Sequence, residues 1–195
     1  MKDQLKELEI PMDDFIKQSK KRDGIPVLKA AIIFTNTDES GERAYYQGYR
    51  QIGGGFKVVP GESTAEKYVL ERAGTIKRAD GSSIPVIFRQ EVFKDPGVMK
   101  KIEDDDSYFF IANRGHSFSD IFEKDSQYYS NNIKRIVLDG ACKGFSRVPG
   151  YQEHHRESAF FATVGTGMGE INNRNTLSIF NGLEQGSSNY VDLQK

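Results

Sequence analysis

The sequence contains a single cysteine, Cys142, and this scarcity excludes a disulfide within the 195-residue chain. No apolar run approaches the roughly 18 residues that a membrane-spanning helix needs. The N-terminal segment lacks the succession of basic, apolar and small residues that is typical of a secretory signal. These absences predict a soluble protein in a reducing compartment, which we expect to be the cytoplasm.

The chain also lacks an excess of charge of either sign. It has 27 basic and 28 acidic residues, a formal net charge of −1, and its lysines and arginines are scattered along the sequence. No overall electrostatic field therefore favours nucleic acid or an anionic membrane as a partner. We expect neither of them to be bound.

Length and composition predict one domain with one sizeable core, because 195 residues with 37% hydrophobic content are too few for two such cores. Residues 1–24 are charged and only weakly periodic, and we interpret them as a solvated N-terminal extension with a helix over 12–20. Residues 25–195 then form the domain. The sequence shows no internal repeat and no low-complexity linker.

Five segments are dense in β-branched and aromatic residues and predict strands. They are 26–36, 83–93, 107–113, 133–140 and 158–165. Between and after them lie four predicted helices and a polar loop. The helices cover 63–74 (with a Ser63–Glu66 capping box), 95–106, a short part of 117–132, and 175–186, and the loop covers 143–157. This alternation predicts an α/β domain with a mostly parallel central sheet flanked by helices.

Two reactive side chains follow predicted strands directly. His116 comes after the apolar segment SYFFIAN, and Cys142 comes after RIVL. If these strands are parallel neighbours, both side chains lie at the same edge of the sheet, where α/β proteins build their sites. A thiol needs a base to become a nucleophilic thiolate, so His116 could activate Cys142. The backbone N–H groups of Cys142 and Ser117 are candidate oxyanion donors.

Other interpretations of these residues stay open. A free cysteine at the end of a central strand often serves only as a small buried hydrophobe. His154 and His155 could provide an alternative base or two metal ligands, but no further ligands occur at zinc spacing. We therefore interpret both histidines as surface residues and expect no metal site.

The order of these segments resembles that of the caspase-like cysteine peptidases, the group that includes caspases, metacaspases and paracaspases. In that group a strand ends in a Gly-His or Ser-His turn, and the next parallel strand ends in a turn that carries the cysteine. FFIANRGHS and RIVLDGACKG are similar to these two motifs. LKAAIIFTN is similar to the first strand of the family and ESTAEKYVLERAG to its first helix, so that the resemblance covers about residues 26–186 in order.

The resemblance implies a caspase-like fold and a cysteine endopeptidase that acts on a protein or peptide substrate without a cofactor. It assigns catalysis to Cys142 and His116. By position, it also assigns Arg114, Asp139 and Gly140 to the pocket for the residue before the cut bond. Arg114 would favour an acidic side chain and Asp139 a basic one, unless the two pair with each other.

The sequence departs from the family pattern at three points. Ser117 replaces the glycine after the histidine, Gly140 stands where the family has an acid or glutamine, and only 26 residues separate His116 from Cys142. These departures favour one alternative to the peptidase, a catalytically inactive interaction or regulatory module with a protein partner. A thiol-dependent transferase or deamidase is a second alternative, because acyl chemistry uses the same nucleophile and base.

Overall fold

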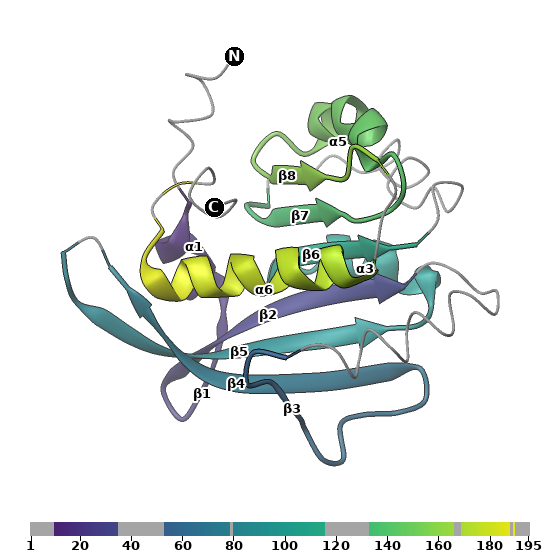
Figure 1. Ribbon diagram of the computed structural model, residues 1–195. Helices are drawn as coiled ribbons and strands as arrows, with labels where there is room; N and C mark the ends of the chain where they lie inside the picture. The colour runs from purple at the N-terminus through teal and green to yellow at the C-terminus, as the bar shows by residue number, and fades with distance from the viewer. Residues whose placement is uncertain are drawn as a thin grey trace.

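Eight strands form one mixed sheet in the computed structural model, which describes residues 10–34, 53–78, 80–115, 133–165, 169–187 and 189 (Figure 1). The side chains of residues 169 and 170 are outside this description. The strands are β1 (Lys20–Arg22), β2 (Ile25–Phe34), β3 (Lys57–Val58), β4 (Lys67–Lys77), β5 (Ser83–Phe93), β6 (Tyr108–Arg114), β7 (Ile136–Asp139) and β8 (Ala159–Ala162).

The sheet has the order β3-β4-β5-β2-β6-β7-β8, and β1 pairs with β2 outside this path. Five neighbouring strands, in the order β5, β2, β6, β7 and β8, run parallel. The other pairs, β4 with β5, β3 with β4 and β1 with β2, are antiparallel. The predicted α/β class with a mostly parallel sheet is therefore confirmed. All five predicted strands are present, and β2 and β6 occupy the centre because their apolar residues are buried on both faces.

The helix predicted over 63–74 is wrong, because most of this segment belongs to strand β4. The Ser63 side chain does not cap a helix; its Oγ accepts a hydrogen bond from the backbone N–H of Val69 at 3.1 Å. Eleven residues of β4 pair with β5, from Lys67 opposite Phe93 to Lys77 opposite Ser83. This long ladder overrides the local helix propensity of the segment.

The polar loop predicted over 143–157 is also wrong. It contains a 3-10 helix, η3 (Gly144–Arg147), followed directly by α5 (Val148–His154). The closing helix α6 (Gly169–Gln185) begins six residues before the predicted start at 175. The helix predicted around Pro96 is confirmed as η2 (Pro96–Val98) and α3 (Met99–Glu103). The helix predicted within 117–132 lies outside the described residues.

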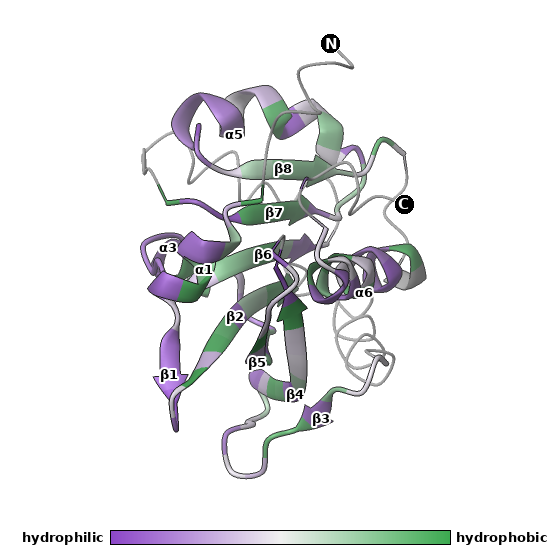
Figure 2. Cartoon of the chain, turned by 90° about the vertical axis from the view of Figure 1, so that its left-hand side faces the viewer, coloured by the Kyte–Doolittle hydropathy of each residue, from purple (hydrophilic) through white to green (hydrophobic). Residues whose placement is uncertain are grey.

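Helices cover the sheet from both sides (Figure 2). α6 lies on one side, where the Phe180 ring contacts Phe88 from β5 and Phe110 from β6 at centroid distances of 5.3 and 6.0 Å. α3 and α5 lie on the other side and contribute Met99 and Tyr151 to a second apolar cluster. Large aromatic side chains thus hold the helices against the central strands.

The N-terminal helix α1 (Met12–Gln18) is present as predicted, but the expectation that this segment is solvated is wrong for its apolar residues. Phe15 is 1% exposed and its ring lies 5.5 Å from that of Phe109 in β6. Ile10 is buried in the same cluster. These contacts, together with the pairing of β1 with β2, join residues 10–22 to the sheet.

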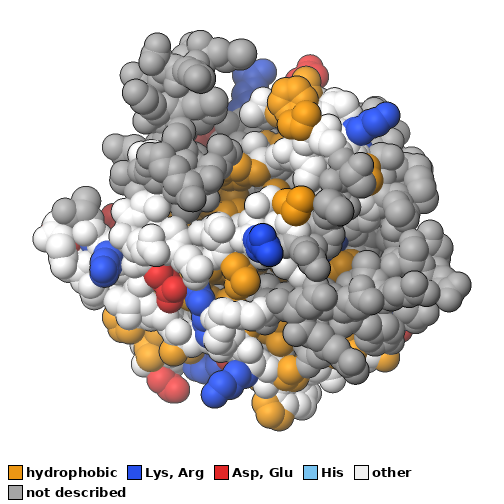
Figure 3. Space-filling model, in the orientation of Figure 1, with side chains coloured by type: hydrophobic (Ala, Val, Ile, Leu, Met, Phe, Trp, Pro, Cys, Tyr) orange, Lys and Arg blue, Asp and Glu red, His pale blue; other side chains and the backbone are white. Residues whose placement is uncertain are grey.

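Charged side chains form a network on the face of β5 opposite to Phe88. The Arg89 guanidinium donates to Glu71 at 2.8 Å and to Glu91 at 2.9 Å, and Glu71 also accepts two bonds from Arg22. The bond from Arg22 is the main cause that lowers the pKa of Glu71. On the face shown in Figure 3, the acidic and basic side chains of the described residues are interspersed, as in the sequence.

Candidate active site

The carboxyl ends of the parallel strands meet at one edge of the sheet, at the right of Figure 1, together with the beginning of α6. β6 and β7 are adjacent and parallel, with Asn113 opposite Asp139. Cys142 follows β7 by three residues and is half-buried. Residues 116–132 lie outside the described part of the chain, so that the placement of His116 and Ser117 stays a prediction.

The turn that carries Cys142 is attached to the strand on each side of β7. On one side, the Gly140 N–H donates to the Asn113 carbonyl of β6 at 2.9 Å. On the other side, the Thr163 N–H donates to the Asp139 carbonyl at 3.1 Å, and the Thr163 hydroxyl donates to the Ala141 carbonyl. A cysteine held between two such attachments has little freedom to move, which is the condition for a preorganised nucleophile.

Asp139 is fully buried below the same turn and forms an ion pair with Arg147. The Arg147 Nε lies 2.7 Å from one carboxylate oxygen, and the other oxygen accepts from the Ala141 N–H and the Asn113 amide. The charge of Asp139 is therefore compensated inside the protein, which speaks against its contact with a basic substrate side chain. The sequence carries no signal for this role of Arg147, because the residue lies in a segment whose polar composition predicts a loop.

Gly140 lies against Asn172 from α6. The Asn172 Nδ2 donates to the Gly140 carbonyl at 2.7 Å, and a Cβ at position 140 would lie 2.7 Å from the Asn172 amide carbon. A Cβ at Gly144 would similarly lie 2.6 Å from the Asp139 carbonyl oxygen. Real Cβ atoms do not approach other atoms so closely, so a Cβ at position 140 would displace the Asn172 side chain and one at position 144 would overlap the Asp139 backbone. The glycine at position 140 thus has a local structural reason, its close contact with Asn172.

Arg114 lies at the end of β6 and is buried. Its guanidinium donates to the Asn173 Oδ1 of α6 at 2.6 Å and lies 5.1 Å from the centre of the Phe34 ring. Burial lowers the pKa of Arg114 to about 10. Arg114 and Asp139 therefore have separate partners, Asn173 and Arg147, and the alternative that they pair with each other is wrong.

Three asparagine side chains at this edge each keep one polar atom buried without a hydrogen-bond partner in the described structure. They are the Oδ1 atoms of Asn113 and Asn172 and the Nδ2 atom of Asn173. A buried polar group without a partner costs free energy, so such groups are rare and call for an explanation such as an ordered water or a ligand. This edge therefore has capacity for further polar contacts.

His154 and His155 lie at the end of α5, and the prediction that both are surface residues is wrong for His155. Its ring is 1% exposed and stacks on that of Tyr151 at a centroid distance of 4.2 Å. α5 precedes β8 in the chain, so these histidines lie near the amino end of that parallel strand, away from the edge that carries Cys142. Neither is placed to act as its base.

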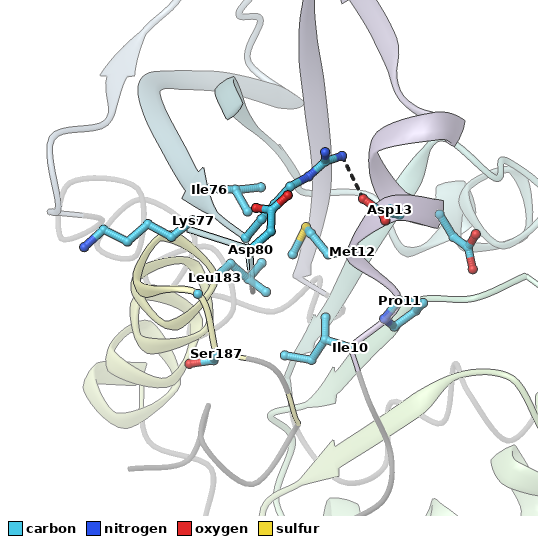
Figure 4. Close-up of a pocket in the computed structure, with 12 residues that line it drawn as sticks. Ile10, Pro11, Met12, Asp13, Ile76, Lys77, Asp80, Leu183 and Ser187 are labelled. Atoms are coloured by element: carbon cyan, nitrogen blue, oxygen red, sulfur yellow. Dashed lines mark hydrogen bonds and ion pairs between the residues drawn. The ribbon is translucent and has the colours of Figure 1, made fainter. Parts of the chain in front are cut away.

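A cavity of about 520 Å³ lies at the opposite, amino-terminal edge of the sheet (Figure 4). Apolar side chains from α1, β4 and α6 line it, including Met12, Ile76 and Leu183. Arg78 and Asp13, which form an ion pair at 2.9 Å, lie at its border. This cavity shares no lining residue with the turn that carries Cys142.

The described residues contain no helix long and apolar enough to span a membrane. They also contain no group of three or more His, Cys, Asp or Glu side chains arranged to hold a metal ion.

No protein-family model matches the sequence, and no curated protein matches it.

Proposed function

We propose that the protein is a cysteine endopeptidase in which Cys142 is the nucleophile and His116 the general base. The observation that carries the proposal is the pairing of β6 with β7. Their parallel register, Asn113 opposite Asp139, ends both strands at the same edge. His116 follows the last residue of β6 by only two positions, which limits its Cα to about 7 Å from that of Arg114.

The same pairing supports a caspase-like arrangement of the sheet. The resemblance implies that the histidine strand and the cysteine strand are consecutive, parallel neighbours, and β6 and β7 have this relation. Strand β8 and helix α6 then follow in the order that the resemblance implies. The segment 63–74 departs from it, since β4 replaces the implied first helix.

The proposed reaction has two steps. In the first, the Cys142 thiolate attacks the peptide carbonyl carbon, and backbone N–H groups of Cys142 and Ser117 donate to the resulting oxyanion. His116, which has taken the thiol proton, gives it to the leaving amine as the C–N bond breaks. In the second step, His116 takes a proton from water, the hydroxide displaces the thiolate, and the peptide acid is released.

The test compares the native protein with Cys142→Ala and His116→Ala on a peptide library with randomised positions, with cleavage detected by mass spectrometry. We expect cleavage by the native protein and none by either variant. His154→Ala, which changes the half-buried histidine of α5, serves as the control and should cleave as the native protein does. Cleavage that persists in Cys142→Ala would overturn the proposal.

Alkylation by iodoacetamide at pH 6 gives a second measurement on the single cysteine. An ordinary thiol is almost entirely protonated at this pH and reacts slowly, so that rapid alkylation requires an adjacent base. We expect His116→Ala to slow the reaction of Cys142 about tenfold or more. Equal rates in the native protein and in His116→Ala would show that the two residues do not act as a pair.

A further inference from the structure

Two large apolar side chains are exposed beside the turn that carries Cys142. Phe145 is 62% exposed and Val164 is 78% exposed, although most large apolar residues in the described structure are buried. Phe145 belongs to η3, and Val164 follows β8 by two residues. Single exposed apolar residues are common, but two of them on neighbouring segments next to a candidate nucleophile indicate a contact surface.

Backbone hydrogen bonds hold these two residues on neighbouring segments. The Phe145 N–H donates to the Thr163 carbonyl at 3.0 Å, and the Lys143 N–H donates to the Gly165 carbonyl at 2.9 Å. Val164 lies between the two acceptors, so that the segment 143–145 runs alongside 163–165. The ion pair of Arg147 with Asp139 further fixes η3 below the turn. The backbones of Phe145 and Val164 are therefore held in place beside the turn that carries Cys142.

The distance of Phe145 from the thiol is limited by the chain. Phe145 lies three positions after Cys142, which places their Cα atoms at most about 11 Å apart. An extended peptide rises about 3.3 Å per residue. Phe145 therefore lies within reach of the residues up to about three positions from a bond cut at Cys142.

We infer that Phe145 and Val164 form a subsite that binds an apolar side chain of the peptide substrate within about three residues of the cut bond. This inference rests on the proposed peptidase function. Two side chains expose at most roughly 250 Å² each, far below the roughly 1,200 Å² at the lower end of stable protein–protein interfaces. One side chain of a peptide matches this area, whereas a second copy of the chain does not.

The test measures kcat/KM on sets of peptides in which each of the three residues on either side of the cut bond is leucine or serine. The native protein should prefer leucine at one position by about tenfold or more. Phe145→Ser and Val164→Ser should lose this preference and cleave the serine peptide as the native protein does. Val58→Ser is the matched control, because Val58 is exposed and lies in β3. This strand is at the opposite end of the strand order from β8.

Binding to the Cys142→Ala protein, measured as the Kd of the leucine and serine peptides by fluorescence anisotropy, gives a readout without turnover. The leucine peptide should bind about tenfold more tightly, and Phe145→Ser in the same background should abolish this difference. Cleavage without a preference for leucine would overturn the subsite alone. Absence of cleavage of every peptide by the native protein would overturn the proposed function, and the subsite with it.

Discussion

At the scale of single residues, burial gives ordinary side chains unusual properties. His155 is buried, stacks on the Tyr151 ring and lies near the buried cation Arg135. Burial, with a smaller contribution from the Arg135 charge, lowers the pKa of His155 from 6.5 to about 4. The folded protein therefore keeps this imidazole neutral at pH values where the unfolded chain protonates it.

This difference predicts that the protein loses stability as the pH falls from about 6.5 towards 4. Between these values the unfolded state binds a proton that the folded state does not, so the free energy of unfolding decreases by about 1 to 2 kcal/mol between pH 7 and pH 5. Urea unfolding at both pH values measures it. The His155→Gln variant should lack most of this decrease in stability, and the control variant His154→Gln should retain it. An equal decrease in both variants would contradict the assignment of the pH dependence to His155.

At the scale of elements, helix α6 supports the strand that carries the candidate nucleophile. Asn172 donates to the Gly140 carbonyl, and Asn173 accepts from Arg114 at the end of β6. Thr176 donates to the Asn172 carbonyl one turn further along the helix. The first turns of α6 thus connect the ends of β6 and β7, the two strands that carry the predicted dyad.

A double-mutant cycle tests this connection. Asn172→Ala should reduce the free energy of unfolding by about 1 to 3 kcal/mol, because the Gly140 carbonyl loses its partner. Gly140→Ala should also destabilise, because its Cβ would overlap the Asn172 amide. The double variant should lose less than the sum, since removal of the amide makes room for the methyl group.

Urea unfolding and the rate of Cys142 alkylation are measured for each member of the cycle. Gly150→Ala is the matched control, because a Cβ there meets no atom within 4 Å and glycine lies within the helix α5. It should be neutral or slightly stabilising, since alanine favours helix over glycine. Strict additivity of the two single changes would show that α6 does not constrain the turn.

At the scale of the whole molecule, the N-terminal segment completes the core. Phe15 contacts Phe109, which in turn lies 5.9 Å from the Phe180 ring of α6. Residues near the start of the chain, in the middle of it and near its end therefore share one aromatic cluster. A solvated extension would show no such contacts.

Phe15→Ala is predicted to reduce the free energy of unfolding by about 3 to 5 kcal/mol, the range for large-to-small changes of buried phenylalanine. Phe145→Ala is the control, because this phenylalanine is exposed and its removal should change stability by no more than about 0.5 kcal/mol. Thermal or urea unfolding of both variants measures the difference. A loss below about 1 kcal/mol for Phe15→Ala would restore the interpretation of a solvated extension.

The sequence by itself determined the central strands and the position of Cys142 just beyond one of them. Runs such as AAIIF in β2 and YFFIA in β6 are apolar on both sides, and such runs are typical of parallel strands that are buried on both faces. Because side chains at the ends of parallel neighbours meet at one edge, the location of a candidate site at the carboxyl ends of the strands could be predicted from this local pattern.

Only the tertiary structure decided the state of segment 63–74 and the partners of the site. The segment has a helical pattern, but antiparallel pairing with β5, the next strand along the chain, makes most of it a strand. Two contacts of the site depend on how η3 and α6 pack against the end of β7. They are the ion pair of Arg147 with Asp139 and the hydrogen bond from Asn172 to Gly140. The physical reason is that periodicity and capping record local preferences, whereas ladder pairing and buried polar partners arise between segments that only the fold brings together.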